Sequence, residues 1–133
     1  MSKKKEYNII IPVDLKPKPD ECERTVAELM AAHYKSDIKF VKRGMMTTPD
    51  ILVLRYNQNW EIKNIRGNSK RTIQNNLRRA DDQSENVVIC LFKTKMTAQQ
   101  AVGRINAELS KANKIRKLIL ITKSHKIIVI KNK

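Results

Sequence analysis

The sequence predicts a single α/β (α+β) domain in which helices flank a mixed central β-sheet. The chain has 133 residues, enough for one hydrophobic core. Its composition, 41% hydrophobic and 31% charged, is typical of a folded chain. Segments with helical spacing of apolar residues alternate with short runs rich in β-branched residues. We expect residues 1–19 to form a basic N-terminal segment, in which residues 7–13 could form an edge strand, and residues 20–133 to form the domain.

The centre of the chain is predicted to be a β-hairpin. Asp50 opens a run rich in β-branched residues, residues 56–59 supply turn chemistry, and a second run follows. Because successive side chains of a strand point to opposite faces, Glu61 and Lys63 share one face of the second strand. Asp50 could face them from the neighbouring strand.

Two interpretations of this hairpin remain open. Two carboxylates can hold a hard cation such as Mg²⁺, which activates water and neutralises charge on a phosphate, while a lysine adds positive charge. Alternatively, Asp50 caps a turn, and Glu61 and Lys63 form an exposed ion pair on one face of a strand.

The segment before the hairpin is predicted to hold one helix and a short strand. Asp20 is a suitable N-cap, and Glu23 completes a capping box. The helix is expected to end near Tyr34, followed by a strand over residues 37–41. Its apolar stripe is expected to contain Cys22, Val26, Leu29, Met30 and His33. Glu23 borders the face that meets the sheet, whereas Glu21 and Glu28 point away from it.

The segment after the hairpin predicts a second helix over residues 70–80, which residues 67–69 separate from the preceding strand. Its N-terminus, with Lys70 and Arg71, could hold a phosphate, although an ordinary solvated helix explains the same residues. A buried strand over residues 86–92 follows. A third helix over residues 97–112 and two strands over residues 117–122 and 126–130 complete the domain.

Positive charge is the strongest compositional feature of the chain. There are 28 Lys and Arg residues against 13 Asp and Glu residues, a formal net charge of +15. Such a charge favours a polyanionic partner: a nucleic acid, an anionic membrane or an acidic protein. Residues 62–80 and the segment after Glu108 contain basic residues and no acid. The expected nucleic-acid contacts are Arg66, Lys70, Arg71, Arg78 and Arg79.

Other features exclude some classes of protein. No apolar run approaches the roughly 20 residues that a membrane helix needs. The basic start of the chain is followed by too short an apolar run for a signal peptide. Cys22 and Cys90 have neither zinc-site nor disulfide-framework spacing, so we expect buried thiols in a reducing compartment.

The motif Pro49-Asp50 with Glu61-Ile62-Lys63 resembles the signature of the PD-(D/E)XK nuclease superfamily. From about Lys18 to Ile130 the chain is also similar to the C-terminal tRNA-nuclease toxin domains of contact-dependent growth-inhibition proteins, and to related phage and mobile-element domains. The resemblance implies a restriction-endonuclease-like αβββαβ core. It implies a metal-dependent nuclease that cuts RNA, with tRNA as the first candidate substrate. The alternatives are a DNA endonuclease of a phage or mobile element, or a non-catalytic nucleic-acid-binding module.

The resemblance also implies roles for individual residues. Asp50 and Glu61 would be metal ligands, Lys63 would be catalytic, and Gln83 would contact substrate or order the site. Glu23, with Glu21 as the second choice, would add a further acidic ligand. The cofactor would be a divalent metal, Mg²⁺ first, with Mn²⁺ or Zn²⁺ as alternatives.

The partners and location follow from the same resemblance. The expected partners are tRNA and an acidic immunity protein, and the expected place of action is the cytoplasm of a target cell. The chain begins with a methionine and shows no delivery segment, which departs from the family pattern. We therefore expect any larger parent protein to lie outside this sequence.

Overall fold

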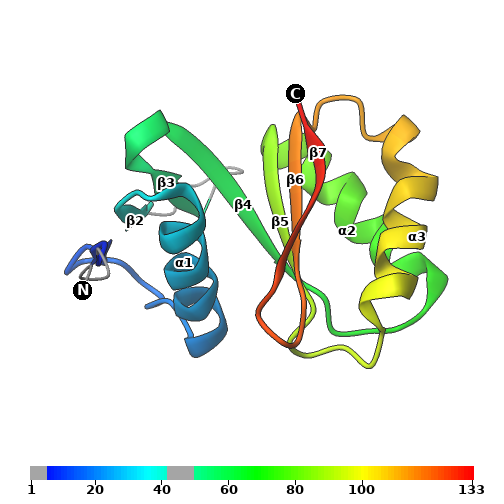
Figure 1. The fold of residues 1–133 in the computed structure, drawn as a ribbon, viewed down its shortest axis with the longest axis horizontal. Coiled ribbons are helices and arrows are strands. Elements are labelled where there is room, and N and C mark those ends of the chain that lie inside the picture. Colours follow the sequence, from blue (N-terminus) through cyan, green and yellow to red (C-terminus); the bar gives the residue numbers. More distant parts are fainter. Residues whose placement is uncertain (1–5, 42–49) are drawn as a thin grey trace, which may run out of the picture.

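The computed structural model describes residues 6–41 and 50–133, and Lys70 by its backbone alone. Pro49, part of the predicted motif, therefore lies outside the described residues. The described residues form a seven-stranded mixed sheet with three α-helices (Figure 1). This confirms the predicted fold class.

The helices and strands follow the predicted order, and β1 lies at the edge of the sheet within the strand expected over residues 7–13. The strands are β1 (Ile9–Ile10), β2 (Ile38–Phe40), β3 (Ile51–Val53), β4 (Gln58–Asn64), β5 (Asn86–Cys90), β6 (Lys117–Ile121) and β7 (Ile127–Asn132). The helices are α1 (Glu21–Tyr34), α2 (Lys70–Gln83) and α3 (Ala98–Glu108), with 3₁₀ turns at Leu54–Tyr56 and Leu109–Lys111.

Strand order in the sheet equals strand order in the chain. The pairs β2–β3, β3–β4 and β6–β7 are antiparallel, whereas β1–β2, β4–β5 and β5–β6 are parallel. Each parallel pair is joined through a helix, as parallel neighbours require a crossover. In Figure 1, β4 runs between a half that contains β2, β3 and α1 and a half that contains β5 to β7, α2 and α3.

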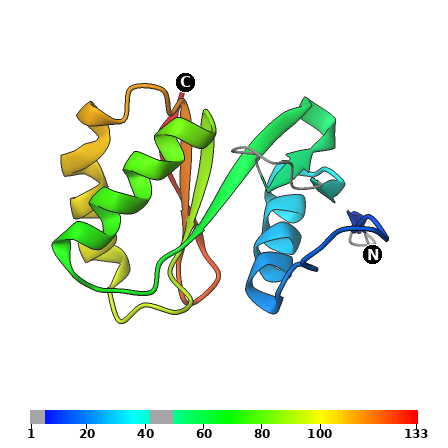
Figure 2. The ribbon, with the colours of Figure 1, turned by 180° about the vertical axis from the view of Figure 1, so that it is seen from behind.

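The helices cover opposite faces of the sheet. Trp60 and Val88 pack in a core that includes Val26 and Met30 of α1. Val87 packs in a second core with residues of α2 and α3. Figure 2 shows α2 and α3 beside the half of the sheet that contains β5 to β7. Because Val87 and Val88 are neighbours on one strand, these two cores lie on opposite faces.

Helix α1 begins as predicted but buries a different arc. Asp20 and Glu23 form the capping box. The buried residues are Val26, Ala27, Met30 and Ala31, whereas His33 is exposed, so the expectation that His33 lies on the buried stripe is wrong. The buried arc is turned towards the two alanines, whose small side chains let the helix approach the sheet closely.

Helix α2 continues beyond its predicted end at Ala80 to Gln83. Asp81, expected to end the helix, instead accepts hydrogen bonds from the backbone N–H groups of Lys114 and Ile115 at 2.8 and 3.1 Å. The side chain of Asp81 therefore binds the backbone of the loop at residues 114 and 115, and the helix continues past it.

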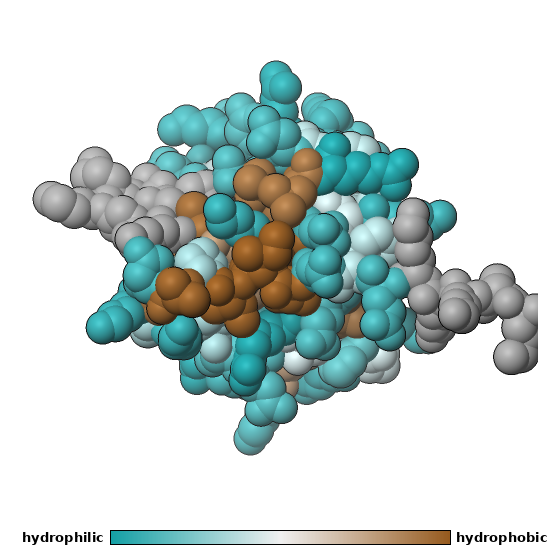
Figure 3. All heavy atoms as spheres, turned by 90° about the vertical axis from the view of Figure 1, so that its left-hand side faces the viewer, coloured by the Kyte–Doolittle hydropathy of each residue, from teal (hydrophilic) through white to brown (hydrophobic). Residues whose placement is uncertain are grey.

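Part of the N-terminal segment packs with the rest of the domain. β1 pairs with β2, and Leu15 is buried beside α1. Ile10 and Val13 remain exposed. Figure 3 shows apolar side chains gathered on the face of the molecule at the left of Figure 1. No helix among the described residues is long and apolar enough to span a membrane.

Candidate active site

The backbone of the β3–β4 hairpin sets Asp50 opposite Glu61. Ile51 pairs with Trp60, and the Asp50 N–H donates to the Trp60 carbonyl oxygen at 3.0 Å. The Asp50 carbonyl oxygen accepts from the Val41 N–H at 2.9 Å. Asp50 is therefore fixed on both sides by neighbouring strands, directly beside the strand that carries Glu61.

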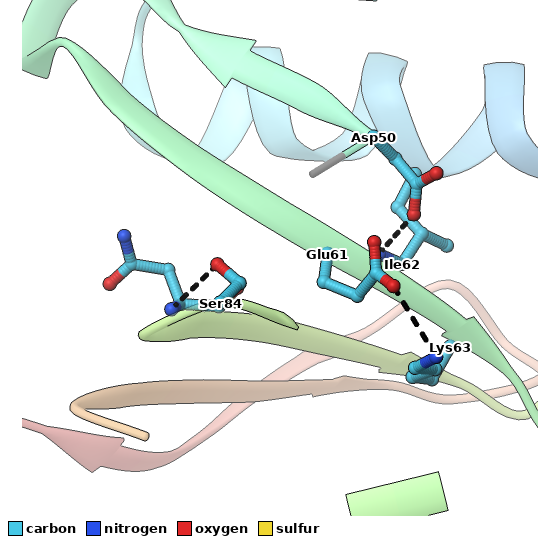
Figure 4. Close-up of polar contacts among 6 residues, drawn as sticks. Asp50, Glu61, Ile62, Lys63 and Ser84 are labelled. Atoms are coloured by element: carbon cyan, nitrogen blue, oxygen red, sulfur yellow. Dashed lines mark hydrogen bonds and ion pairs between the residues drawn. The ribbon is translucent and has the colours of Figure 1, made fainter. Parts of the chain in front are cut away.

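The side chains of Asp50, Glu61 and Lys63 converge at this point (Figure 4). Asp50 Oδ2 accepts a hydrogen bond from the Ile62 N–H at 2.8 Å, and Lys63 Nζ lies 3.3 Å from Glu61 Oε2. The side chains of Glu61 and Lys63 are only 5% and 15% exposed. The alternative of an exposed surface ion pair is therefore wrong, because pairing of β4 with β5 and packing of α2 remove this face from solvent.

The electrostatics of Glu61 are unusual for a carboxylate. The pKa of Glu61 is raised from its ordinary value of 4.5 to about 8, chiefly by burial and then by the neighbouring Asp50 carboxyl, while Lys63 opposes the shift. A buried carboxylate beside a second carboxylate disfavours two negative charges. The site therefore favours a species that brings positive charge to it, either a proton or a cation.

The environment of one Glu61 oxygen is suited to a bound cation. Glu61 Oε1 is buried and has no hydrogen-bond partner among the described residues. Mg²⁺ is usually bound through one or two carboxylates, with waters and substrate phosphate completing its shell. Asp50 and Glu61 supply such a pair, so the residues fit a hard divalent cation.

The structure does not bring Glu23 to this pair. Glu61 pairs with Val87, which packs under α2 and α3, whereas α1 packs against the opposite face. Glu23 Oε1 accepts the Asp20 N–H at 3.2 Å as part of the capping box. Among residues 6–41 and 50–133, no three His, Cys, Asp or Glu side chains are grouped as ligands for one metal ion. Glu21, the second choice, is exposed in the first turn of α1.

Gln83 lies at another cavity. It is the last residue of α2 and helps to line a cavity of about 530 Å³ whose lining does not include Asp50, Glu61 or Lys63. Its Oε1 atom is buried without a hydrogen-bond partner among the described residues. The structure therefore places Gln83 in a cavity that does not include the carboxylate pair, and its expected role toward the substrate stays a prediction.

The predicted basic contacts are exposed wherever the structure describes their side chains. Arg66, Arg71, Arg78 and Arg79 are all exposed, and the side chain of Lys70 lies outside what the structure describes. Arg78 lines a groove between α2 and α3 together with three acidic residues and one lysine, namely Asp81, Asp82, Glu108 and Lys111. Its charge is thus partly offset by neighbours on the protein.

Sequence reasoning missed the basic residues beside Gln83. Arg116, Lys117 and Lys133 line the same cavity, with Asn57 and Asn59 from the segment predicted to be a turn. The acid-free run after Glu108 was the available signal. It gave no indication that the start of β6 would lie beside the end of α2.

Comparisons with known proteins agree with this architecture. The structure is similar to a chain of the CdiA-CT/CdiI toxin and immunity complex from Burkholderia pseudomallei, with a TM-score of 0.65 and 19% sequence identity. The likeness covers 93% of this chain and 98% of that chain, and at this identity it shows the fold alone. No curated protein matches the sequence.

A match to a protein family identifies the class of protein to which the chain belongs. The model of the family described as contact-dependent growth inhibition CdiA C-terminal domain matches residues 47–132. The chain therefore belongs to this family, and its class is a toxin domain of contact-dependent growth inhibition. The matched range includes Asp50, Glu61 and Lys63 and excludes α1 with Glu23.

Proposed function

We propose that this toxin domain is a metal-dependent nuclease whose active site is formed by Asp50, Glu61 and Lys63. The observation that carries the proposal is the convergence of the Asp50 carboxyl, just before β3, with the largely buried carboxyl of Glu61 and ammonium group of Lys63 on β4. A structural role alone does not explain it, because a buried carboxylate with an unsatisfied oxygen costs stability. The net charge of +15 supports a polyanionic substrate.

Each residue of the site has a distinct task in this proposal. Asp50 and Glu61 would hold the divalent cation, Mg²⁺ first, which when bound would polarise the scissile phosphate and activate the attacking water. The Ile62 N–H fixes one oxygen of Asp50 and thereby its orientation. Lys63 provides a positive group that neutralises charge developing on the phosphate oxygens. The contact of Lys63 Nζ with Glu61 Oε2, at 3.3 Å, orients the ammonium group before the substrate arrives.

The substrate we propose is a structured RNA, with tRNA first. Exposed basic residues include Arg71 and Arg79 on α2, Arg66 on the loop before it, and Arg116 and Lys133 beside the start of β6 and the end of β7. This spread suits a compact polyanion recognised through its backbone and shape. A DNA substrate is the second candidate, since the same groups can act on either backbone.

The biological setting proposed here follows from the family. As a growth-inhibition toxin the domain would act in the cytoplasm of a target cell, and an acidic immunity protein would neutralise it in the producing cell. The similar structure from Burkholderia pseudomallei is that of a toxin and immunity complex, which supports this partner. The large positive charge supports an acidic binding surface on it.

The deciding experiment removes the site and the metal separately. Total tRNA and plasmid are incubated with the wild type, with Asp50→Ala and with Lys63→Ala, in Mg²⁺ and in excess chelator. We expect cleavage by the wild type in Mg²⁺ only and none by Asp50→Ala. Lys63→Ala should lower kcat by at least about 100-fold with little change in KM, since it acts on the transition state. Cleavage by Asp50→Ala at the wild-type rate would remove the active site from this hairpin.

A further inference from the structure

The cavity beside Gln83 has the chemistry of a nucleotide-binding site. Its volume is about 530 Å³. It is lined by three basic residues, one acid, a serine and five side-chain amides: Arg116, Lys117, Lys133, Glu85, Ser84, Asn57, Gln58, Asn59, Gln83 and Asn86. The balance favours an anionic ligand that also carries polar groups able to pair with amides.

The wall of the cavity is held by hydrogen bonds between distant segments. Asn86 Nδ2 donates to the Asn59 carbonyl oxygen at 2.9 Å, and Ser84 Oγ donates to the Asn86 carbonyl oxygen at 2.9 Å. The N–H groups of Arg116 and Lys117 both donate to the Glu85 carbonyl oxygen, at 2.7 and 3.0 Å. The starts of β4, β5 and β6 are therefore fixed around the cavity before any ligand binds.

Gln83 contributes an unused hydrogen-bonding group. Its buried Oε1 has no hydrogen-bond partner among the described residues, although buried amide oxygens are normally paired. The carboxyl end of α2, which carries partial negative charge, lies at the same place. This side of the cavity suits a donor such as a base amino group or a ribose hydroxyl. The basic side suits a phosphate, and a nucleotide carries both.

The cavity is next to the carboxylate pair along β4. Asn59, Glu61 and Lys63 share one face of this strand, and residues two apart are separated by about 6.6 Å. Figure 4 shows Ser84, another residue of the cavity wall, beside the same strand as Glu61. A nucleic-acid strand whose phosphate lies at the carboxylate pair would place a neighbouring nucleotide at this cavity.

We infer that the Gln83 cavity is a subsite for a nucleotide flanking the scissile phosphate, with Arg116 and Lys117 binding its phosphate and Gln83 binding its base or sugar. The choice of ligand rests on the proposed nuclease function. The subsite itself is testable by binding, without cleavage.

The first test measures binding of a short, fluorescently labelled single-stranded oligoribonucleotide in a Glu61→Gln background, which prevents cutting. Arg116→Ala/Lys117→Ala should weaken binding by at least about tenfold and reduce the slope of log affinity against log salt by about 0.7, because both residues bind the same phosphate. The control is Lys123→Ala/Lys126→Ala, which removes two exposed charges at the β6–β7 turn. Equal losses in both double variants would overturn the subsite.

The second test addresses Gln83. Gln83→Met keeps the approximate length of the side chain and removes the amide, so the fold should be at least as stable in thermal unfolding. Binding should weaken, and in the cleavage-competent protein KM should rise more than kcat falls. Wild-type binding by Gln83→Met would contradict the assigned contact. Binding of a DNA oligonucleotide of the same sequence then shows which group of the nucleotide Gln83 contacts. Tighter binding of RNA than of DNA assigns the contact to the 2′-hydroxyl, and equal binding assigns it to the base.

The two proposals fail in different ways. A wild type that cuts nucleic acid while both sets of cavity variants bind normally would remove the subsite and leave the nuclease. Weakened binding in the cavity variants of a protein that cuts neither RNA nor DNA would leave the subsite and remove the nuclease.

Discussion

At the scale of single residues, opposing effects act on the protonation of Glu61. Burial and Asp50 both favour its neutral form, while Lys63 favours its charged form. Such opposition is typical of functional carboxylates. A cation bound to Asp50 and Glu61 would relieve the repulsion between them and satisfy the buried oxygen of Glu61.

This arrangement predicts how stability depends on pH in metal-free protein. The pKa of Glu61 is about 8 in the folded state against about 4.5 ordinarily, so the folded state keeps its proton while the unfolded state has lost it. The free energy of unfolding should therefore fall as pH rises from about 4.5 to about 8, by up to a few kcal/mol. Glu61→Gln should remove this loss. Urea unfolding in chelator across this range measures both proteins, and parallel curves would contradict the pKa shift.

Side-chain alternation was enough to predict that Glu61 and Lys63 share a face and that Asp50 could oppose them. It could not predict their burial, because burial depends on β5 lying beside β4 and on α2 covering that face. The environment of Gln83 could not be predicted from the sequence either. It depends on Arg116 and Lys117, which the chain reaches only after another strand and helix.

At the scale of elements, α1 tests the role assigned to Glu23. The structure gives Glu23 a capping role at the start of α1. Glu23→Ala should therefore lower the free energy of unfolding by about 0.5–1 kcal/mol, and Asp20→Ala by about 1 kcal/mol. Neither should change the Mg²⁺ concentration needed for half-maximal cleavage. A higher Mg²⁺ requirement in Glu23→Ala alone would restore Glu23 as a metal ligand.

The basic residues of α2 should differ in their contribution to binding. Arg79 is exposed, whereas Arg78 lies in a groove with Asp81, Asp82 and Glu108. Arg79→Ala should reduce the slope of log affinity against log salt by about 0.7–0.9. Arg78→Ala should change it less, because nearby acids already offset its charge. Filter binding of tRNA in a salt series compares them, and equal slopes for Arg79→Ala and wild type would place Arg79 outside the interface.

Element type was predictable where the apolar pattern was strong, as in β5 and α3. The residues at which elements begin and end were harder to predict. Asp81 looked like a helix terminator, yet its partners are the N–H groups of Lys114 and Ile115, more than thirty residues away. The buried arc of α1 was misplaced because Ala27 and Ala31 contribute little to a hydrophobic pattern, although small side chains suit close helix–sheet contact.

At the scale of the whole molecule, the sheet order follows from local connections. The antiparallel neighbours β3–β4 and β6–β7 are joined by short turns, and the parallel neighbours by the three helices. The mixed sheet was therefore predictable from the order of elements. The parallel pairing of β1 with β2 was not, because β1 contains only Ile9 and Ile10 and depends on α1 to bring it alongside β2.

The last prediction concerns the substrate of the whole molecule. The +15 charge provides affinity for any nucleic acid, so selectivity must come from shape. The basic residues on α2 and at the start of β6 lie on different elements of one small domain, an arrangement that suits a compact RNA better than a straight duplex. Purified tRNA and linear plasmid should be digested side by side in Mg²⁺ and then in Mn²⁺, with Asp50→Ala as the inactive control. We expect tRNA to be cut and plasmid to stay intact. Plasmid fragmentation with intact tRNA would overturn the RNA assignment and leave the nuclease proposal standing, because the carboxylate pair can act on either backbone.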